Sequence, residues 1–335
     1  AHQNDLFGGD FLLSGEVLNA YNKDGGNLNN IMGANLSKEF NDADIAMVNN
    51  EFPFSIRGEK APDKQFTFRT DPKHVNILTE MGVDIVSLAN NHVLDYGEDA
   101  LVDTLTTLEE ASILYAGAGN NLDEAKEIKY IEKNGKTIAI LCASRVIPVA
   151  EWNATDVKPG LFTTYDPTKL VEQIKEAETK ADISVVYVHW GLERKSMPEQ
   201  YQRGLGKQYI DAGADLVIGA HSHCLQGMEV YNGKLITYSL GNFIFNGRTA
   251  DTMALKANID KENNISVEFI PCVSKAYQTE IATEDKYKSI IDYYKGISYD
   301  VDIDDYGKVA IENSSSEDYE EDIASEDITY ATDNN

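Results

Sequence analysis

The sequence predicts an α/β protein, in which strands and helices alternate along the chain. Short apolar runs recur along the 335 residues, and each is bounded by turn residues. Their length and β-branched content are typical of strands buried on both faces. Segments with apolar residues at helical spacing lie between several of these runs. Because 42% of the residues are hydrophobic, the chain can bury one large core.

The predicted strands begin near the N-terminal end and continue to about residue 240. They cover residues 6–7, 45–48, 83–88, 138–141, 183–188, 216–218 and 235–238. The predicted helices cover residues 71–82, 98–112, 167–181 and 201–213. Two of these helices begin at an Asp-Pro pair, which is typical of an N-cap followed by a first-turn proline.

After about residue 250 the pattern changes. Two alternating segments surround residues 261–264 and predict a β-hairpin, and a helix is expected over 284–295. From 297 to 335, acidic residues far outnumber the single lysine. Such a composition cannot bury enough apolar surface to become ordered. We therefore expect a folded domain over 1–280 and an acidic, partly flexible extension over 281–335.

The net charge and the lengths of the apolar runs exclude some partners. A formal net charge of −27 makes a nucleic acid an unsuitable ligand. No run of about 18 apolar residues is present, so no segment is expected to span a membrane. The first residue is Ala1 and not Met, so we expect a processed chain. Any membrane association would then depend on an N-terminal anchor that has been removed.

Polar side chains follow five of the predicted strands at the point where each strand ends. They are Asp10, Glu51, Asn91 with His92 and Asp95, His189, and the pair His221 and His223. The carboxyl ends of parallel strands meet at one edge of a sheet, where α/β proteins place their sites. Carboxylates, amide oxygens and neutral imidazoles are ligands that Zn, Mn and Fe accept. One such ending is ordinary turn chemistry, but five together favour a metal site.

Four segments resemble the capsule-biosynthesis CapA family, whose members accompany poly-γ-glutamate synthesis. They are "VNNEFPFS" (48–55), "VSLANNHVLDYG" (86–97), "VHWGLE" (188–193) and "DAGADLVIGAHSHCLQGMEVYNGKLITYSLGNF" (211–243). The resemblance extends from about residue 6 to 245. Because that family is related to the calcineurin-like metallophosphatases, the resemblance implies a metallophosphatase-like fold. This fold is a four-layer α-β-β-α sandwich with two metal ions at the strand ends.

The resemblance also implies which residues bind the metal ions. Two divalent ions, of Mn, Zn or Fe, would be held by Asp10, Glu51, Asn91, His189, His221 and His223. The aspartate and the last histidine would bind the first ion. The asparagine and the other two histidines would bind the second ion, and the glutamate would bridge both.

Four further residues receive roles beside the expected metal ions. By the resemblance, His92 would stabilise or protonate the leaving oxygen, and Asp95 would orient its imidazole. Arg69 is expected to pair with a substrate carboxylate through its planar guanidinium, or alternatively with a nearby surface acid. Glu193 is expected to contact the substrate or to hold a histidine of the site in place.

The chain departs from the metallophosphatase pattern at two positions. Where such enzymes have Asp-x-His, this chain has Asp10-Phe11-Leu12, and the bridging ligand is Glu51 in place of aspartate. The first ion would keep only Asp10, Glu51 and His223, with water completing its shell. We therefore expect this ion to bind weakly or to exchange.

The resemblance implies a protein of poly-γ-glutamate capsule biosynthesis with a metal-dependent hydrolase or transferase site. The electrophile would be a phosphate ester or an amide such as a γ-glutamyl bond. Two alternatives stay open: a non-catalytic accessory subunit of the capsule synthesis or export machinery, and a metallophosphatase for small substrates. The expected partners are poly-γ-glutamate or its synthetase and export subunits. The expected location is the extracellular face of the cell membrane, or outside the cell after secretion.

Overall fold

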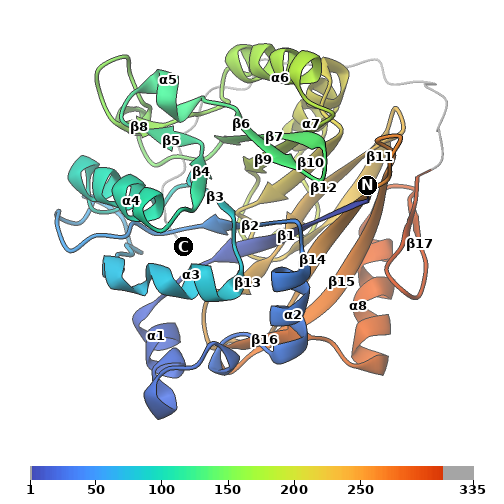
Figure 1. Cartoon of the computed structure of the whole chain (residues 1–335), viewed down its shortest axis with the longest axis horizontal. Helices are drawn as coiled ribbons and strands as arrows, with labels where there is room; N and C mark the ends of the chain where they lie inside the picture. The colour runs from blue at the N-terminus through green and yellow to red at the C-terminus, as the bar shows by residue number, and fades with distance from the viewer. Residues whose placement is uncertain (1, 312–335) are drawn as a thin grey trace.

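The larger of two β-sheets carries the N-terminal strand near its centre. The computed structural model describes residues 2–311 and gives this sheet the order β16-β15-β14-β1-β2-β3-β4, with β13 paired to β1 (Figure 1). Strands β1 to β4 are parallel, whereas β14 to β16 extend the sheet in antiparallel fashion. The strands are β1 (Gln3–Phe11), β2 (Ile45–Asn50), β3 (Ile85–Ser87), β4 (Leu114–Ala116), β13 (Asn242–Ile244), β14 (Ala250–Ile259), β15 (Ile265–Lys275) and β16 (Gln278–Ile281).

The second sheet has the order β11-β12-β10-β9-β7-β6. Its central strands are parallel, and the antiparallel strands β6 and β11 form its edges. The strands are β6 (Lys129–Lys133), β7 (Lys136–Ser144), β9 (Ile183–His189), β10 (Leu216–Ala220), β11 (Leu225–Tyr231) and β12 (Lys234–Leu240). Two small pairs lie outside both sheets: β5 (Ala118–Gly119) with β8 (Gly160–Leu161), and β17 (Asp302–Ile303) with β18 (Val309–Ala310).

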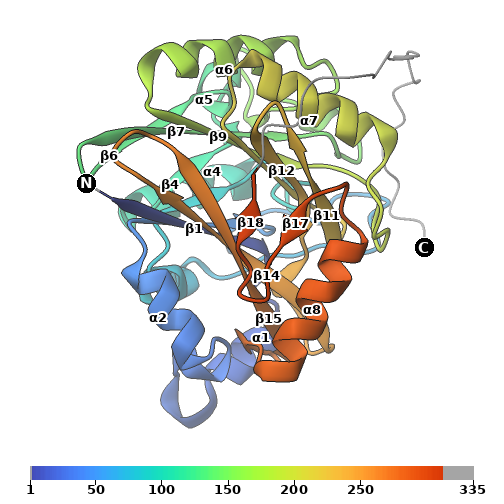
Figure 2. The ribbon, with the colours of Figure 1, turned by 90° about the vertical axis from the view of Figure 1, so that its right-hand side faces the viewer.

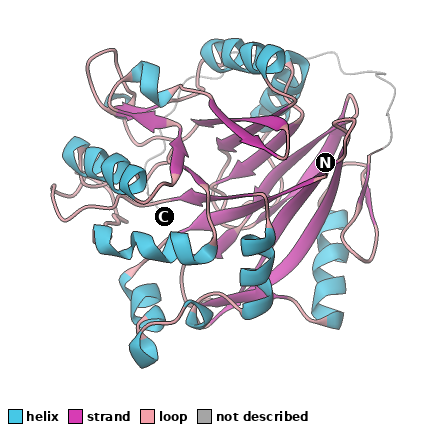
Figure 3. Ribbon diagram, viewed as in Figure 1, coloured by secondary structure: helices cyan, strands magenta, loops and turns pink. Residues whose placement is uncertain are grey.

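Helices cover the outer face of each sheet, which confirms the expected four-layer α-β-β-α sandwich (Figure 2, Figure 3). The larger sheet is covered by α1 (Gly15–Tyr21), α2 (Ala34–Asp42), α3 (Asn76–Met81) and α4 (Glu98–Glu110). The second sheet is covered by α6 (Thr168–Lys180) and α7 (Gln200–Ala212). The remaining helices are α5 (Leu122–Ala125), α8 (Glu284–Gly296), which packs against β11 and β15, and short 3₁₀ helices at Lys23–Gly25, Leu28–Asn30, Pro72–Val75 and Ala150–Trp152.

Alternate side chains of the central strands enter different cores. In β9, Val185 and Tyr187 pack between the two sheets, whereas Val186 and Val188 pack beneath the outer helices. Each such side chain stabilises the fold by about 1.5–3 kcal/mol through burial. The Tyr187 hydroxyl also donates a hydrogen bond to the backbone oxygen of Gly8 over 2.8 Å, which joins the two sheets. A strand buried on both faces has a continuous apolar sequence, and this apolar run is what allowed β9 to be predicted.

The predicted elements are present, with shifted ends. The strand expected at 6–7 extends over the nine residues of β1, and the one expected at 83–88 is reduced to β3. The predicted hairpin is β14 and β15, and the C-terminal helix is α8. Both Asp-Pro pairs mark helix starts: Asp71 accepts a hydrogen bond from the backbone nitrogen of Lys73, and Asp166 accepts one from that of Thr168.

Two expectations from the sequence concern the C-terminal part of the chain and membrane spans. The expected flexibility of the acidic tail concerns residues beyond 311, which lie outside the described residues. The domain division at residue 280 stays a prediction, although α8 packs against strands of both sheets. Within residues 2–311, no helix is long and apolar enough to cross a membrane.

Asp5, in the first half of β1, is expected to make stability depend on pH. Burial, together with the charges of Asp44 and Asp84, raises its pKa from 3.8 to about 7 against the opposing hydrogen bond from Gln3. Between these two pH values the folded chain keeps a proton that the unfolded chain has released, so stability falls as pH rises. Asp5→Asn should therefore be more stable than the wild type at pH 8, by about 3 kcal/mol.

Urea unfolding at pH 4, 6 and 8 measures this difference. The gain of Asp5→Asn over the wild type should be small at pH 4 and largest at pH 8. Asp156→Asn removes the same charge from an exposed position and should leave the profile unchanged. An Asp5→Asn protein whose stability falls with pH as steeply as that of the wild type would contradict the prediction.

Candidate metal centre

The carboxyl ends of parallel strands in both sheets converge at one buried site. Asp10 lies in β1, Glu51 directly follows β2, and His189 ends β9. His221 and His223 follow β10, which pairs with β9 so that Ala220 lies opposite His189. All of these side chains are buried except that of His223, which is half-buried. The structure therefore brings these strand-end residues together, and their binding of metal stays a prediction.

A close backbone contact places Asp10 inside the site. The backbone nitrogen of Asp10 donates to the carbonyl oxygen of Gly241 over 2.9 Å. At the preceding residue, Gly9, a Cβ atom would lie only 2.1 Å from the same carbonyl oxygen, so a side chain cannot be accommodated there. Gly241 itself has φ of +76°, which favours glycine. The two glycines thus allow β1 to approach the turn between β12 and β13.

The amide of Asn49 connects the two carboxylates. Its Nδ2 donates to Asp10 Oδ1 and to Glu51 Oε1, both over 3.0 Å, and lies 3.2 Å from His189 Nδ1. Its own oxygen accepts a hydrogen bond from Asn90 Nδ2 over 3.1 Å. The sequence assigned no role to these two asparagines. Their position just before a predicted ligand is the signal that could have indicated one.

Three polar atoms in the centre of the site have no hydrogen-bond partner within the described residues. They are Asp10 Oδ2, Glu51 Oε2 and His221 Nδ1, and all are buried. Unpartnered buried polar atoms are costly, and two adjacent carboxylates repel each other. A divalent cation would remove both costs: it takes carboxylate oxygen and imidazole nitrogen as ligands, and its charge offsets the repulsion between the carboxylates. The donor set therefore fits a metal ion.

Burial keeps two of the imidazoles neutral. It lowers the pKa of His189 well below the usual range, and burial together with the charge of His223 lowers the pKa of His221 to about 3. Neutral imidazole is the form that binds metal ions. For His223 burial also acts to lower the pKa, but its contact with Asp10 outweighs burial and raises it.

Burial and neighbouring charges also shift the pKa values of the two carboxyl groups, Asp10 and Glu51, in opposite directions. Burial acts to raise the pKa of Asp10, but the contact with His223 outweighs it, and the pKa of Asp10 falls below its usual range. Burial, followed by the charge of Asp10, raises the pKa of Glu51 well above its usual range. Without a cation, the pair therefore favours one negative charge and one proton.

Two groups of side chains come close enough to hold an ion. One group is Asp10, Glu51 and His189, and the other is Glu193, His221 and His223; within each, one ligand atom per residue lies within 4.8 Å of the others. The rings of His189 and His221 have centroids 4.5 Å apart, so the groups adjoin. This grouping differs from the division into two ions that the resemblance implies. Asn91 adjoins the first group, since its Oδ1 lies 3.0 Å from His189 Nε2.

The turn that carries His221 and His223 has an unusual backbone. His221 has φ of +100° and His223 has φ of +56°, values that residues other than glycine rarely adopt. The turn is held by a hydrogen bond from the Arg194 nitrogen to the Ser222 oxygen over 2.7 Å and by contact of His223 Nδ1 with Asn242 Oδ1 at 2.8 Å. Strained backbone is retained where a site needs it, which supports a functional role for both histidines.

His92 and Asp95 form the pair that the resemblance implies. Asp95 Oδ2 lies 2.7 Å from His92 Nδ1, so Nδ1 carries the hydrogen and donates it. No hydrogen bond to His92 Nε2 occurs between residues 2 and 311, so that nitrogen can meet a reacting group. The ring packs against Phe68, with centroids 4.6 Å apart.

Lys64 belongs to this cluster, although its sequence context gave no sign of it. Its ammonium donates to Asp95 Oδ1 over 2.6 Å and to the Asn91 carbonyl oxygen over 2.5 Å. It also lies 3.2 Å from His92 Nδ1, and its side chain is only 3% exposed. The backbone nitrogen of Phe68 donates to Asp95 Oδ2 as well. The loop between β2 and α3 is thereby fixed to the site.

Arg69 lies at the surface of the same loop. Its guanidinium donates to the carbonyl oxygens of Arg57 and Gly58 and stacks on the Tyr96 ring, 4.2 Å from its centroid. No ion pair of Arg69 is found in the part of the chain that the structure describes, so the alternative surface pair is not seen. Its role in substrate binding stays a prediction. Glu193 is also exposed, but its Oε1 lies 4.0 Å from His223 Nε2.

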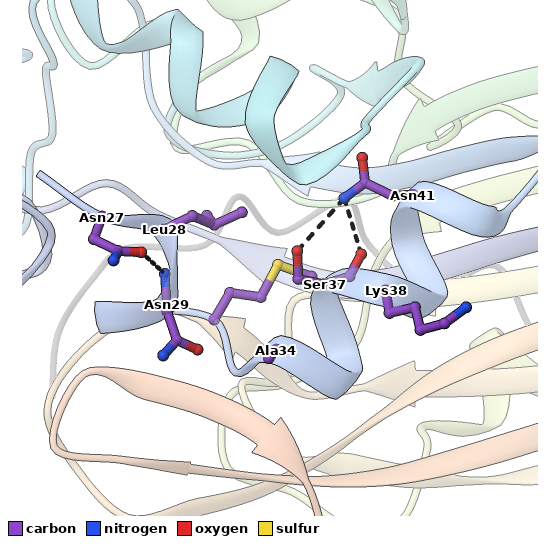
Figure 4. A pocket seen from close by; sticks show the side chains of 8 residues that line it. Asn27, Leu28, Asn29, Ala34, Ser37, Lys38 and Asn41 are labelled. Atoms are coloured by element: carbon purple, nitrogen blue, oxygen red, sulfur yellow. Dashed lines mark hydrogen bonds between the residues drawn. The ribbon is translucent and has the colours of Figure 1, made fainter.

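A surface pocket of about 380 Å³ lies beside α2, away from these residues (Figure 4). Its lining contains no carboxylate and no imidazole: it consists of Asn27, Leu28, Asn29, Met32, Ala34, Ser37, Lys38 and Asn41. The lysine is already paired with Asp42. This pocket therefore lacks the groups that metal binding or acid–base chemistry needs.

Comparison with known proteins points to one family. Residues 6–247 match the model of the family described as bacterial capsule synthesis protein PGA_cap. The PGA biosynthesis protein CapA of Bacillus subtilis (strain 168) is 36% identical over 237 residues, which cover 69% of this chain and 62% of that protein. The capsule biosynthesis protein CapA of Bacillus anthracis is 32% identical over 266 residues, covering 76% of this chain and 63% of that protein.

The chain spans less than two thirds of the length of both relatives. Among solved structures, a hypothetical protein from Thermus thermophilus superposes with a TM-score of 0.51 at 18% identity, covering 82% of this chain and 100% of that one. At this identity the likeness concerns the fold alone.

Proposed function

Since the chain belongs to the bacterial capsule synthesis protein family, we propose that it acts in the synthesis of a poly-γ-glutamate capsule as a metal-dependent hydrolase or transferase. One observation carries the proposal: Asp10 and Glu51 are buried side by side, each with an oxygen that has no hydrogen-bond partner within residues 2–311, next to neutral imidazoles. A structural role alone does not account for such a costly arrangement.

Two divalent ions are proposed, with Asp10, Glu51, Asn91, His189, His221 and His223 as ligands. When bound, such ions polarise the scissile group and activate a water molecule. The chain's own residues supply the remaining chemistry. Asn49 orients both carboxylates, and Asp95 and Lys64 fix the ring of His92. His92 Nε2, which carries no hydrogen while Nδ1 donates to Asp95, would accept the proton that the attacking water releases and pass it to the leaving nitrogen or oxygen, so that the departing group leaves neutral.

We propose a γ-glutamyl amide as the bond that is cleaved or transferred, on the ground that both relatives are named for capsule or PGA biosynthesis. The net charge of −27 opposes binding of a long polyanion, so the proposed partners include the synthetase and export subunits as well as the polymer. The proposed location is the outer face of the cell membrane or outside the cell, where a capsule is assembled.

A second function is favoured by one residue. Leu12 stands where metallophosphatases have an imidazole, and it is buried in the core. A site with a weakened metal position is compatible with a non-catalytic accessory subunit. Metal binding without turnover would favour that alternative.

Activity on matched chromogenic substrates tests the proposal. We expect wild-type protein loaded with Mn or Zn to hydrolyse a γ-glutamyl anilide. Asn91→Ala and His223→Ala should reduce the rate at least about 100-fold by removing a ligand. An aryl phosphate tests the phosphatase alternative, and the exposed variant Glu110→Gln is the control. Full activity in both ligand variants would exclude a catalytic metal centre.

A further inference from the structure

Glu193 lies where a ligand on the solvent side of the metal centre would be needed. Of the group Glu193, His221 and His223, the two histidines come from the strained turn, and His221 Nδ1 is buried without a partner among the described residues. His223 directs Nδ1 to Asn242 and Asp10, which leaves Nε2 for a further partner. The carboxylate of Glu193 lies close to this nitrogen, with Oε1 4.0 Å from His223 Nε2.

This distance is too long for a hydrogen bond but suits two ligands of one ion. Ligand atoms about 2.1 Å from a metal lie roughly 3 to 4.2 Å from one another. Two imidazoles and one carboxylate, with an open position for water, form the donor set that catalytic zinc sites use. The other group has its own carboxylates and its own imidazole, so the two groups share no ligand.

The backbone around Glu193 is fastened to the turn that carries the histidines. Arg194, the next residue, donates its backbone nitrogen to Ser222 and has φ of +59°. Two further bonds hold the same loop: the Gly191 nitrogen donates to the Tyr201 hydroxyl over 2.6 Å, and Gln226 donates to the Lys195 oxygen over 2.9 Å. The Glu193 side chain nevertheless remains 44% exposed. It is therefore positioned by its backbone and can be reached from solvent.

We propose that Glu193, His221 and His223 bind a divalent cation at the solvent side of the centre, next to the ion that Asp10, Glu51 and His189 hold. The carboxylate of Glu193 would supply a further protein ligand to a site whose first motif has Leu12 and no imidazole. This inference rests on the proposed function in one respect, since it assumes that the site binds metal. It differs from the expected arrangement, in which Glu193 contacts substrate or holds a histidine.

Titration of metal-free protein with Zn²⁺ and Co²⁺ tests this assignment. Calorimetry should find two ions in the wild type, and Glu193→Gln should weaken one of them at least about 100-fold while the other stays unchanged. The visible absorption of bound Co²⁺ should change in Glu193→Gln, because a ligand and not merely a nearby charge is lost. Glu151→Gln, which removes an exposed charge elsewhere, should change neither measurement.

The outcomes separate the two claims. If Glu193→Gln binds both ions with wild-type affinity and an unchanged Co²⁺ spectrum, Glu193 is not a ligand, although the proposed function stands. If the wild type binds one ion that is lost in His189→Ala and retained in Glu193→Gln, the inference is again wrong. If the wild type binds no ion, the proposed function itself fails.

Discussion

Glu51→Gln is expected to stabilise the metal-free protein by about 2 kcal/mol and to abolish its stabilisation by metal. Glu51 is fully buried beside Asp10, and burial followed by the charge of Asp10 raises its pKa. Glutamine keeps the oxygen that accepts from Asn49 and adds an amide hydrogen that can donate to Asp10. The substitution thus removes the cost of keeping a buried carboxyl group protonated beside Asp10, and it offers a donor to an acceptor without a hydrogen bond, without changing the shape.

The loss of stabilisation by metal in Glu51→Gln is expected to be larger than the gain in stability of the metal-free variant. A ligand present at about 1,000 times its dissociation constant stabilises the folded state by about 4 kcal/mol. Wild-type protein should therefore melt at a higher temperature after Mn or Zn is added, whereas Glu51→Gln should not respond. Calorimetric scans with and without metal measure both effects, and Glu110→Gln should behave as the wild type does. A metal-free Glu51→Gln protein that melts below the wild type would overturn this account.

Opposite effects of one substitution would distinguish a functional site from a structural one. If a buried carboxylate contributes to stability, the protein becomes less stable when that carboxylate is replaced by a neutral side chain. A carboxylate kept for metal binding costs stability until the metal is present. The buried pair Asp10 and Glu51 has the second character, because one oxygen of each carboxyl group has no hydrogen-bond partner among the described residues.

Much of the fold could be predicted because its central strands are parallel and buried on both faces. Such strands, for example β9 and β10, have continuous apolar sequences that stand out from the helices between them. The strands that the sequence analysis did not identify are short or lie at sheet edges, as β4, β5, β6 and β16 do. Their residues pack on one face only or span two to five positions, so their pattern is too brief to recognise.

The site could be predicted where chain topology alone determines proximity. Parallel strands of one sheet end at the same edge, so Asp10 and Glu51 had to come together once their strands were identified. His189 ends a strand of the other sheet, and it joins them only because the two sheets pack with these strand ends side by side. The contacts of Lys64 depend instead on the path of a loop without regular structure. Its partner Asp95 is 31 residues away, and no periodicity relates the two. Sequence patterns therefore indicate the ligands better than the residues that position them.

Lys64→Met is expected to destabilise the protein by about 3–5 kcal/mol, a large effect for one loop residue. The ammonium of Lys64 and the carboxylate of Asp95 lie 2.6 Å apart, and both side chains are almost fully buried. Methionine retains the apolar stem beside Trp152 but leaves the carboxylate buried without its cation. Urea unfolding of the wild type and the variant at pH 7 measures the loss.

Two further variants identify the cause of that loss. Arg57 of the same loop forms an ion pair with Asp103 of α4. The Arg57 side chain is 52% exposed, so Arg57→Met should cost only about 0–1 kcal/mol. Adding Asp95→Asn to Lys64→Met removes the uncompensated charge and keeps an acceptor for His92, so part of the stability should return. If instead the double variant is less stable than Lys64→Met by the full cost of Asp95→Asn alone, the two residues act independently. Lys64 would then hold the loop through the Asn91 carbonyl oxygen, and the orientation of His92 would not depend on it.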